Sequence, residues 1–170
     1  AINTGYSLIH GRGVYKTVRI TGATDTEILA ESAPGGEATT QLFQGASMKK
    51  LLAECEYVTL LCATIGPELE DRVDAIKAEE PAAAYYLEMV GGWMADYMIA
   101  RVDDRAEVAI KKSGYGRTMR FSPGYGDWPV TTQSEFLRVV DASRIGVTCM
   151  ESSILQPRKS VTAIAGWKRG

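Results

Sequence analysis

The sequence has few of the residues on which most metal and nucleophilic sites depend. Its 170 residues include one histidine, His10, and three cysteines, Cys55, Cys62 and Cys149. The cysteines stand apart in apolar surroundings, so we expect buried free thiols and neither a disulfide framework nor a CxxC metal clip. A single histidine excludes a histidine-rich metal site, and no GxSxG motif accompanies it. We expect His10 to lie in a loop or at a strand end.

Long apolar runs and an excess of basic charge are also missing. The longest apolar run, residues 58–65, is far shorter than the roughly 20 residues of a membrane-spanning helix. A formal net charge of -2 gives no general basic field for a phosphate backbone. We therefore expect neither a membrane nor nucleic acid as a partner. No secretion signal is visible, which favours a cytoplasmic location, and neither GxGxxG nor a Walker loop is present.

Strand-like and helix-like patterns follow one another irregularly along the chain. The patterns predict strands at 14–20, 27–32, 57–66, 117–121, 145–152 and 161–168. Helices are expected at 46–56, 67–80, 82–111 and 131–142, with caps at Ser47 and at Thr131 or Thr132, and a loop at 32–40. Because strands and helices do not alternate strictly, we predict a single α+β domain over residues 1–170, with a mainly antiparallel sheet.

The longest predicted helix, residues 82–111, should cross the core. Apolar residues recur along it with a period near 3.6, at Tyr86, Met89, Val90, Trp93, Met94, Tyr97, Met98 and Val102. Two adjacent glycines, Gly91 and Gly92, each cost about 1 kcal/mol relative to alanine in mid-helix. They need a reason such as close packing or room for a ligand.

The segment RFSPGYGDWPV, residues 120–130, has the composition of a stiff turn that is open at its glycines. Pro123-Gly124 favours a tight turn that presents Tyr125, and Gly126 lets a ligand approach the backbone. Arg120 offers a planar guanidinium that suits a carboxylate. The alternative is that Trp128 and Tyr125 fill the core while Arg120 pairs with a nearby acid.

A second segment, residues 150–164, reads as a hairpin. Glu151 and Ser152 stand at the end of one predicted strand, and a turn containing Pro157 leads to the next. Such a hairpin could wall one side of a cleft.

With these two segments a resemblance becomes plain. RFSPGYGDWP followed by a helix and IGVTCMESSILQPRKSVTAIAG resembles the activation domain of cobalamin-dependent methionine synthase, in a short free-standing form. CEYVTLLCATIGPELEDRV and the long helix after it are similar too, so the resemblance covers about residues 10–168. It implies a single curved domain with a twisted antiparallel sheet and one long central helix.

The resemblance also implies a ligand and partners. S-adenosylmethionine would bind in a shallow groove, with Arg120 on its carboxylate, the backbone of Ser122 on its adenosine part and Tyr125 close to the sulfonium. Cobalamin would be carried by a methionine synthase or related corrinoid protein, and the electron would come from a flavodoxin-like donor. The expected binding residues are Arg120, Ser122, Pro123, Gly124, Tyr125, Gly126, Asp96, Glu151 and Ser152.

The sequence departs from the family at Gly92. Family members carry a glutamate there for the amino group of the ligand, and Asp96, one turn further along the helix, could take its place. A surface role for Asp96, or an ion pair with Arg101, remains open at this stage.

Two functions therefore compete. The first is a reactivation subunit that binds S-adenosylmethionine and supports reductive methylation of cob(II)alamin on the partner, without being a complete enzyme. The second is a module that docks on a corrinoid protein and binds no methyl donor. A third reading makes Glu151 an acid or base beside Tyr125 in an unrelated enzyme.

Overall fold

The computed structural model describes residues 7–31 and 38–170, and its centre is a six-stranded antiparallel sheet with the order β3-β2-β1-β4-β8-β5. The strands are β1 (Arg12–Ala23), β2 (Glu27–Glu31), β3 (Ala38–Gln44), β4 (Tyr57–Thr64), β5 (Tyr115–Arg117) and β8 (Ser160–Arg169). β4 pairs with β1 and β8 over its whole length. The predicted α+β class with a mainly antiparallel sheet is confirmed.

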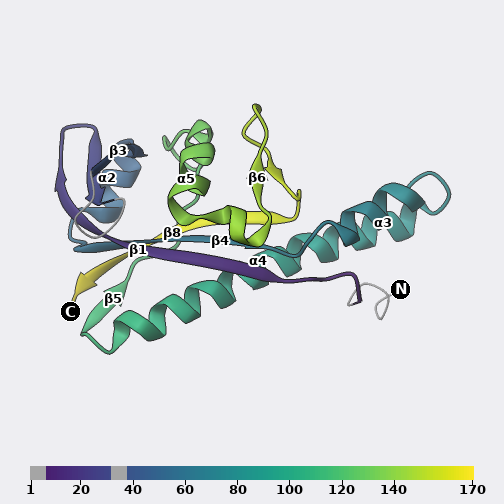
Figure 1. Ribbon diagram of the computed structural model, residues 1–170, viewed down its shortest axis with the longest axis horizontal. Coiled ribbons are helices and arrows are strands. Elements are labelled where there is room, and N and C mark those ends of the chain that lie inside the picture. Colours follow the sequence, from purple (N-terminus) through teal and green to yellow (C-terminus); the bar gives the residue numbers. More distant parts are fainter. Residues whose placement is uncertain (1–6, 32–37) are drawn as a thin grey trace.

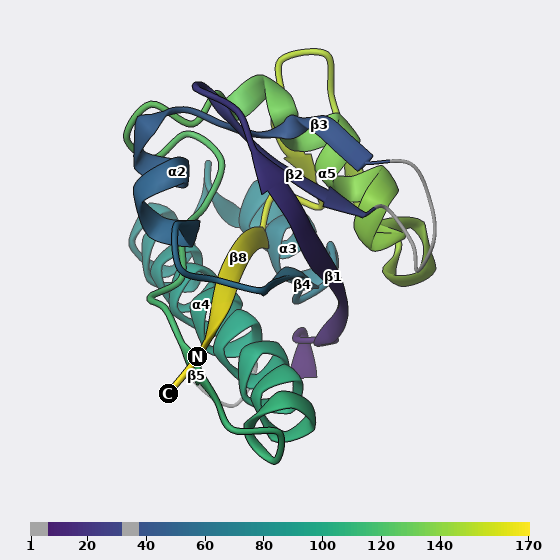
Figure 2. The ribbon, with the colours of Figure 1, turned by 90° about the vertical axis from the view of Figure 1, so that its left-hand side faces the viewer.

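Helices cover both faces of this sheet (Figures 1 and 2). The long helix α4 (Pro81–Lys111) lies across one face, and α3 (Glu68–Ile76) packs against its first half. The other face carries α2 (Ala46–Leu52), α5 (Gln133–Val140), the short helices η1 (Val130–Thr132) and η2 (Ala142–Ile145), and a two-stranded hairpin of β6 (Thr148–Cys149) and β7 (Leu155–Gln156). No helix in the described ranges has the length and apolar character to cross a bilayer.

The apolar run of β4 is explained by its position between two helical layers. Every residue from Val58 to Thr64 is buried, since one set of side chains faces α5 and the alternate set faces α4. β8 alternates in the same way. Ala163 and Trp167 pack on the α4 side, whereas Thr162 donates a 2.8 Å hydrogen bond to Gln133 of α5. This alternation decides where the neighbouring site residues point.

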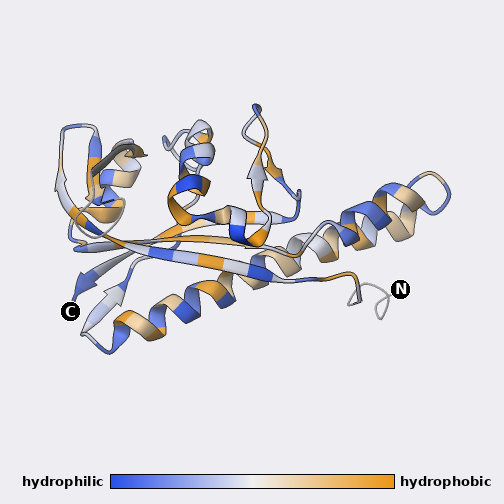
Figure 3. Cartoon of the chain, viewed as in Figure 1, coloured by the Kyte–Doolittle hydropathy of each residue, from blue (hydrophilic) through white to orange (hydrophobic). Residues whose placement is uncertain are grey.

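Helix α4 is confirmed, but its predicted apolar face is buried only in part: Met94, Met98 and Val102 pack inward, whereas the aromatic residues do not. Figure 3 shows that hydrophobic and hydrophilic residues both occur along its length. Tyr86, Trp93 and Tyr97 are mostly exposed, and the residues that contact the sheet and α3 are mainly small: Ala84, Gly91, Ala95, Ile99, Val102, Asp103 and Ala106. Small side chains let the helix approach its neighbours closely, which leaves the bulky aromatic residues on the outside.

The two glycines of α4 have different surroundings. A Cβ atom at Gly91 would lie 2.9 Å from Leu69 Cδ2 and 3.0 Å from Lys159 Cε, whereas a Cβ at Gly92 would meet nothing within 4 Å. Close packing therefore accounts for Gly91 alone.

Replacing Gly92 by alanine is expected to raise the free energy of unfolding by about 1 kcal/mol, because alanine favours the helix and the added methyl group meets no atom. The matched variant Gly91→Ala should be less stable than Gly92→Ala, because its methyl group must displace Leu69 and Lys159. Urea denaturation of both variants measures the difference. Equal stabilisation by the two alanines would contradict the packing described above.

Other predicted elements need adjustment. The loop predicted at 32–40 lies outside the described residues over 32–37, and residues 38–40 already belong to β3. The predicted strands 145–152 and 161–168 do not form a hairpin with each other, because Thr148 and Cys149 pair with Gln156 and Leu155 while β8 joins the main sheet. Cys55 and Cys62 are buried free thiols as expected, whereas the free thiol of Cys149 is only partly buried. Burial raises the pKa of Cys62 to about 12.

Candidate functional site

The loop from Arg120 to Val130 is closed by its own backbone. Tyr125 N–H donates to Ser122 O, Trp128 N–H donates to Tyr125 O, and Gly124 N–H donates to Trp128 O at 2.9 Å. Gly124 and Gly126 have φ angles of 93° and 56°, in the left-handed region that glycine adopts without strain. The predicted turn is therefore a compact unit that turns Tyr125 outward, with 61% of its surface exposed.

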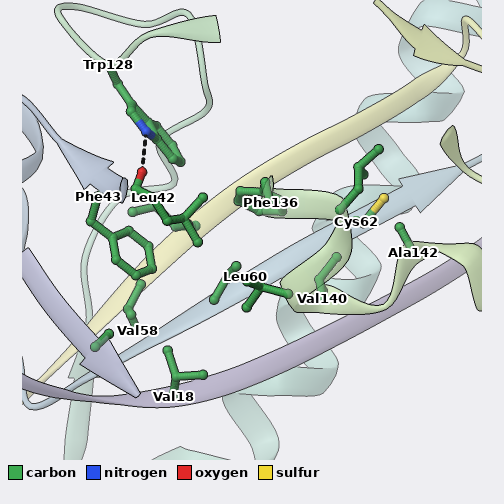
Figure 4. Close-up of a cluster of buried hydrophobic side chains, with 14 of the residues drawn as sticks. Val18, Leu42, Phe43, Val58, Leu60, Cys62, Trp128, Phe136, Val140 and Ala142 are labelled. Atoms are coloured by element: carbon green, nitrogen blue, oxygen red, sulfur yellow. Dashed lines mark hydrogen bonds between the residues drawn. The ribbon is translucent and has the colours of Figure 1, made fainter. Parts of the chain in front are cut away.

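Trp128 anchors this loop in the core. Its side chain is 1% exposed, and its indole N–H donates a 2.8 Å hydrogen bond to the carbonyl of Leu42 in β3 (Figure 4). The ring stacks on Phe121 at 6.1 Å and also touches Phe136 of α5. The alternative reading from the sequence thus holds for Trp128, which fills the core, but not for the exposed Tyr125.

Asp127 ties the same loop to the start of α2. Its carboxylate accepts hydrogen bonds from the backbone N–H groups of Ala46, at 2.6 Å, and Ser47, at 3.0 Å. The cap predicted at Ser47 is therefore replaced by an aspartate from a distant part of the chain, and Gly45 is the N-cap residue. Thr132 is the N-cap residue of α5, as predicted, but its hydroxyl donates to Pro129 O and makes no capping hydrogen bond.

Low pH should weaken the hydrogen bonds between Asp127 and the start of α2. Hydrogen bonds from Ser47 and then Ala46 hold the pKa of Asp127 below its ordinary value of 3.8. A carboxyl whose pKa is lower in the folded state stabilises the fold above its unfolded pKa, and this stabilisation is lost as the pH falls through the folded pKa. Asp127→Asn should lower the melting temperature at pH 7, with the difference from wild type shrinking below about pH 4. Asp96→Asn, which changes an exposed carboxylate with no partner in the described chain, is the control; an equal effect of both would contradict this role.

Arg120 points to the opposite side of the sheet from Phe121. Phe121 bridges Ile164 of β8 and packs on the α5 side, so the preceding Arg120 faces α4. There its guanidinium lies 3.7 Å from Asp103 Oδ2, and Arg117 lies 2.7 Å from the same oxygen. The Arg120 side chain is still 36% exposed, so the ion pair leaves part of the guanidinium open to solvent.

Asp103 is the acid that sequence reasoning missed. It is 2% exposed, and burial raises its pKa although the charges of Arg117 and Arg120 act in the opposite direction. Its Oδ1 atom is buried without a hydrogen-bond partner in the described chain. The signal in the sequence was its spacing, because Asp103 lies eleven residues after Gly92 and therefore on nearly the same face of the helix.

Asp96 lies on this face of α4 as well, between Gly92 and Asp103. Seven residues separate it from Asp103, or roughly 10 Å along the axis, with a rotation of about 20°. Asp96 is exposed and has no ion-pair partner among residues 7–31 and 38–170, and Arg101 pairs instead with Asp104 at 3.6 Å. Arg120 and Asp96 thus present a cation and an anion near the same edge of the sheet.

Glu151 and Ser152 lie in the turn that joins β6 to β7, away from the main sheet (Figure 1). Both are exposed, and Met150 N–H donates to Ile154 O to close the turn. In the described chain no hydrogen bond or ion pair joins either residue to the loop of Arg120. The structure therefore groups Arg120 with Asp103 and orders Ser122–Gly126 beside it, but does not bring in the hairpin.

An open depression of about 690 Å³ lies on the other flank of Asp127 and was not predicted. Residues of the β1–β2 turn and of α2 line it together with Asp127 and Pro129, and none of the predicted binding residues does. The described residues also contain no cluster of three or more His, Cys, Asp or Glu side chains that could hold a metal ion.

Comparison with known proteins places the fold. No family model matches the sequence, and no curated protein matches it. Among solved structures, the chain is similar to the MetH reactivation domain bound to AdoHcy, with a TM-score of 0.58 and 14% sequence identity. The match covers 95% of this chain and 59% of that one, so this chain corresponds to little more than half of its structural neighbour. The fold is therefore similar to that of part of the MetH reactivation domain.

Proposed function

We propose that this chain is a single activation-type domain that binds S-adenosylmethionine and presents its methyl group to a corrinoid held by a separate protein. The proposal is supported by the shared fold and by the neighbour's bound AdoHcy, the product left when S-adenosylmethionine loses its methyl group. One observation carries it: the partly open guanidinium of Arg120 lies directly before an ordered turn that exposes Tyr125.

Each group has a physical role in this proposal. The planar guanidinium of Arg120 would bind the ligand carboxylate, while the ion pair with Asp103 of α4 holds the guanidinium in position. Asp96 would accept the ligand ammonium in place of the family's glutamate. An aromatic face such as that of Tyr125 attracts a sulfonium cation by about 0.5–2 kcal/mol. These residues bind and orient the methyl donor, and no acid or base is needed for the transfer.

The methyl acceptor belongs to the partner. A corrinoid supplies the reduced cobalt that takes the methyl group, with an electron delivered by a flavodoxin-like donor. The proposed partner is a cobalamin-dependent methionine synthase or a related corrinoid protein. The proposed role is that of an activation subunit that serves this partner.

Isothermal titration with S-adenosylmethionine and S-adenosylhomocysteine tests the proposal. We expect both to bind, with S-adenosylmethionine tighter by up to about 30-fold, because only its sulfonium carries the charge that the Tyr125 ring attracts. The absence of heat at millimolar ligand, with the protein shown to be folded, would reject the methyl-donor role.

A second candidate is a docking module that binds a corrinoid protein without a methyl donor. It is favoured by the open space above Gly92, where no carboxylate is available, and by the engagement of Arg120 with Asp103. In that case a change in the absorbance of the corrinoid should appear on mixing the two proteins without S-adenosylmethionine. A change that requires S-adenosylmethionine would favour the first function.

A further inference from the structure

The outer face of α4 carries an unusual row of exposed apolar side chains, which we call the aromatic stripe: Tyr86, Met89, Trp93 and Tyr97. The spacings of three, four and four residues keep these side chains on one side of the helix over about three turns. Trp93 is 67% exposed, and it is the only exposed tryptophan, because Trp128 and Trp167 are buried in the core. A row of large exposed apolar residues of this kind marks an interaction surface.

From this stripe we infer that α4 pairs with α4 of a second copy of this chain, antiparallel and about a two-fold axis close to Trp93. Pairing about this axis places Tyr86 of one copy opposite Ala100 of the other, and the two Trp93 side chains opposite each other. Met89 comes opposite Tyr97 in the same arrangement. A two-fold interface requires such self-complementarity of one surface.

Charge along the helix favours the antiparallel direction. Between residues 78 and 100 the chain has four acidic residues and no basic one, namely Glu79, Glu80, Glu88 and Asp96. Residues 101–112 carry a net charge of +1, with the basic Arg101, Arg105, Lys111 and Lys112 and the acidic Asp103, Asp104 and Glu107. Antiparallel pairing brings the weakly positive second part of each helix to the acidic first part of the other, whereas parallel pairing would bring the two acidic parts together.

Some of these charged residues are free to form ion pairs with a second copy of the chain. Arg105, Glu79 and Glu80 are exposed, and none of them has an ion-pair partner in the described parts of the chain. In the antiparallel arrangement Arg105 of one copy lies near Glu80 of the other. The pairing thus gives opposite charges to groups that have no ion-pair partner among residues 7–31 and 38–170.

The area of the aromatic stripe sets the expected affinity of the dimer. Four large side chains, most of them more than half exposed, would bury on the order of 1,000 Å² over the two copies, at the low end for a specific interface. We therefore expect a reversible dimer that dissociates on dilution in the micromolar range. The inference does not depend on S-adenosylmethionine binding.

Sedimentation equilibrium and tryptophan fluorescence of the full chain test it. The wild-type protein should dimerise with rising concentration, and its emission should shift to shorter wavelength as Trp93 becomes covered. Trp93→Glu should weaken association about 30-fold or more, since it removes a central aromatic residue and places like charges on the axis. Ile154→Glu, which changes an exposed apolar residue in the turn between β6 and β7 on the other side of the sheet, is the matched control and should associate like wild type.

Charge reversal tests the direction of the helices. Arg105→Glu should weaken the dimer by about 2- to 5-fold, and adding Glu80→Arg should restore it, because the opposite charges then face each other again. Circular dichroism shows whether each variant is folded. A wild-type monomer at millimolar concentration, a dimer unaffected by Trp93→Glu, or a failure of the double variant to recover would each overturn the inference.

Discussion

Trp128→Ala should lower the free energy of unfolding by about 3–5 kcal/mol, the largest effect expected of any substitution in the 120–130 loop. The indole is fully enclosed by Phe121, Phe136 and the strand that contains Leu42, so its removal leaves a cavity and an unpaired carbonyl. Urea denaturation followed by circular dichroism measures the loss.

The control for Trp128 lies three residues away in the same loop. Tyr125→Ala removes a ring of comparable size that is largely exposed, so its effect on unfolding should stay within about 0.5 kcal/mol. If the two alanines destabilised the protein equally, the view that Trp128 anchors the loop and Tyr125 is free to meet a ligand would be wrong.

Arg120→Ala should weaken S-adenosylmethionine binding by about 10- to 100-fold, because it removes a charge-assisted hydrogen bond to the ligand carboxylate. The fold should be little affected, since Asp103 keeps its shorter contact with Arg117 at 2.7 Å. Titration calorimetry of the folded variant gives the change in affinity.

The matched variant is Arg138→Ala, which removes an arginine of α5 that pairs with Glu135 on the surface. It should bind the ligand as wild type does. Full affinity in Arg120→Ala would reject this residue as the carboxylate-binding group and would leave open that S-adenosylmethionine binds elsewhere on the chain.

Local patterns were sufficient to predict most of the elements. β4 was recognised from its short, β-branched apolar run, and α4 from its period and from Pro81 at its start. The period did not reveal which side of α4 is buried, because large apolar residues occur on both sides: Trp93 and Tyr97 lie on the outer side, and Met94 and Met98 pack on the inner side. Hydrophobicity alone cannot distinguish these two sides when close approach, which depends on residue size, decides the packing.

The candidate site was predicted in part for a similar reason. Arg120 and the turn at Pro123-Gly124 could be read from composition, since guanidinium chemistry and turn geometry are local properties. Asp103 and the contact of Asp127 with α2 could not, because each depends on a pairing between segments far apart in the chain. The hairpin of Glu151 was placed beside the wrong strand because two short strands offer little register information.

The anchors of the 120–130 loop also bear on how the protein folds. Trp128 reaches back 86 residues to Leu42, and Asp127 reaches back 80 residues to Ser47. Contacts between residues so far apart in the sequence form slowly, because a long loop must close before they contribute any stability. The loop should therefore become ordered late, after β3 and α2 are in place. In a nascent chain that has not yet emerged beyond Trp128, the turn that exposes Tyr125 would lack the contacts that order it.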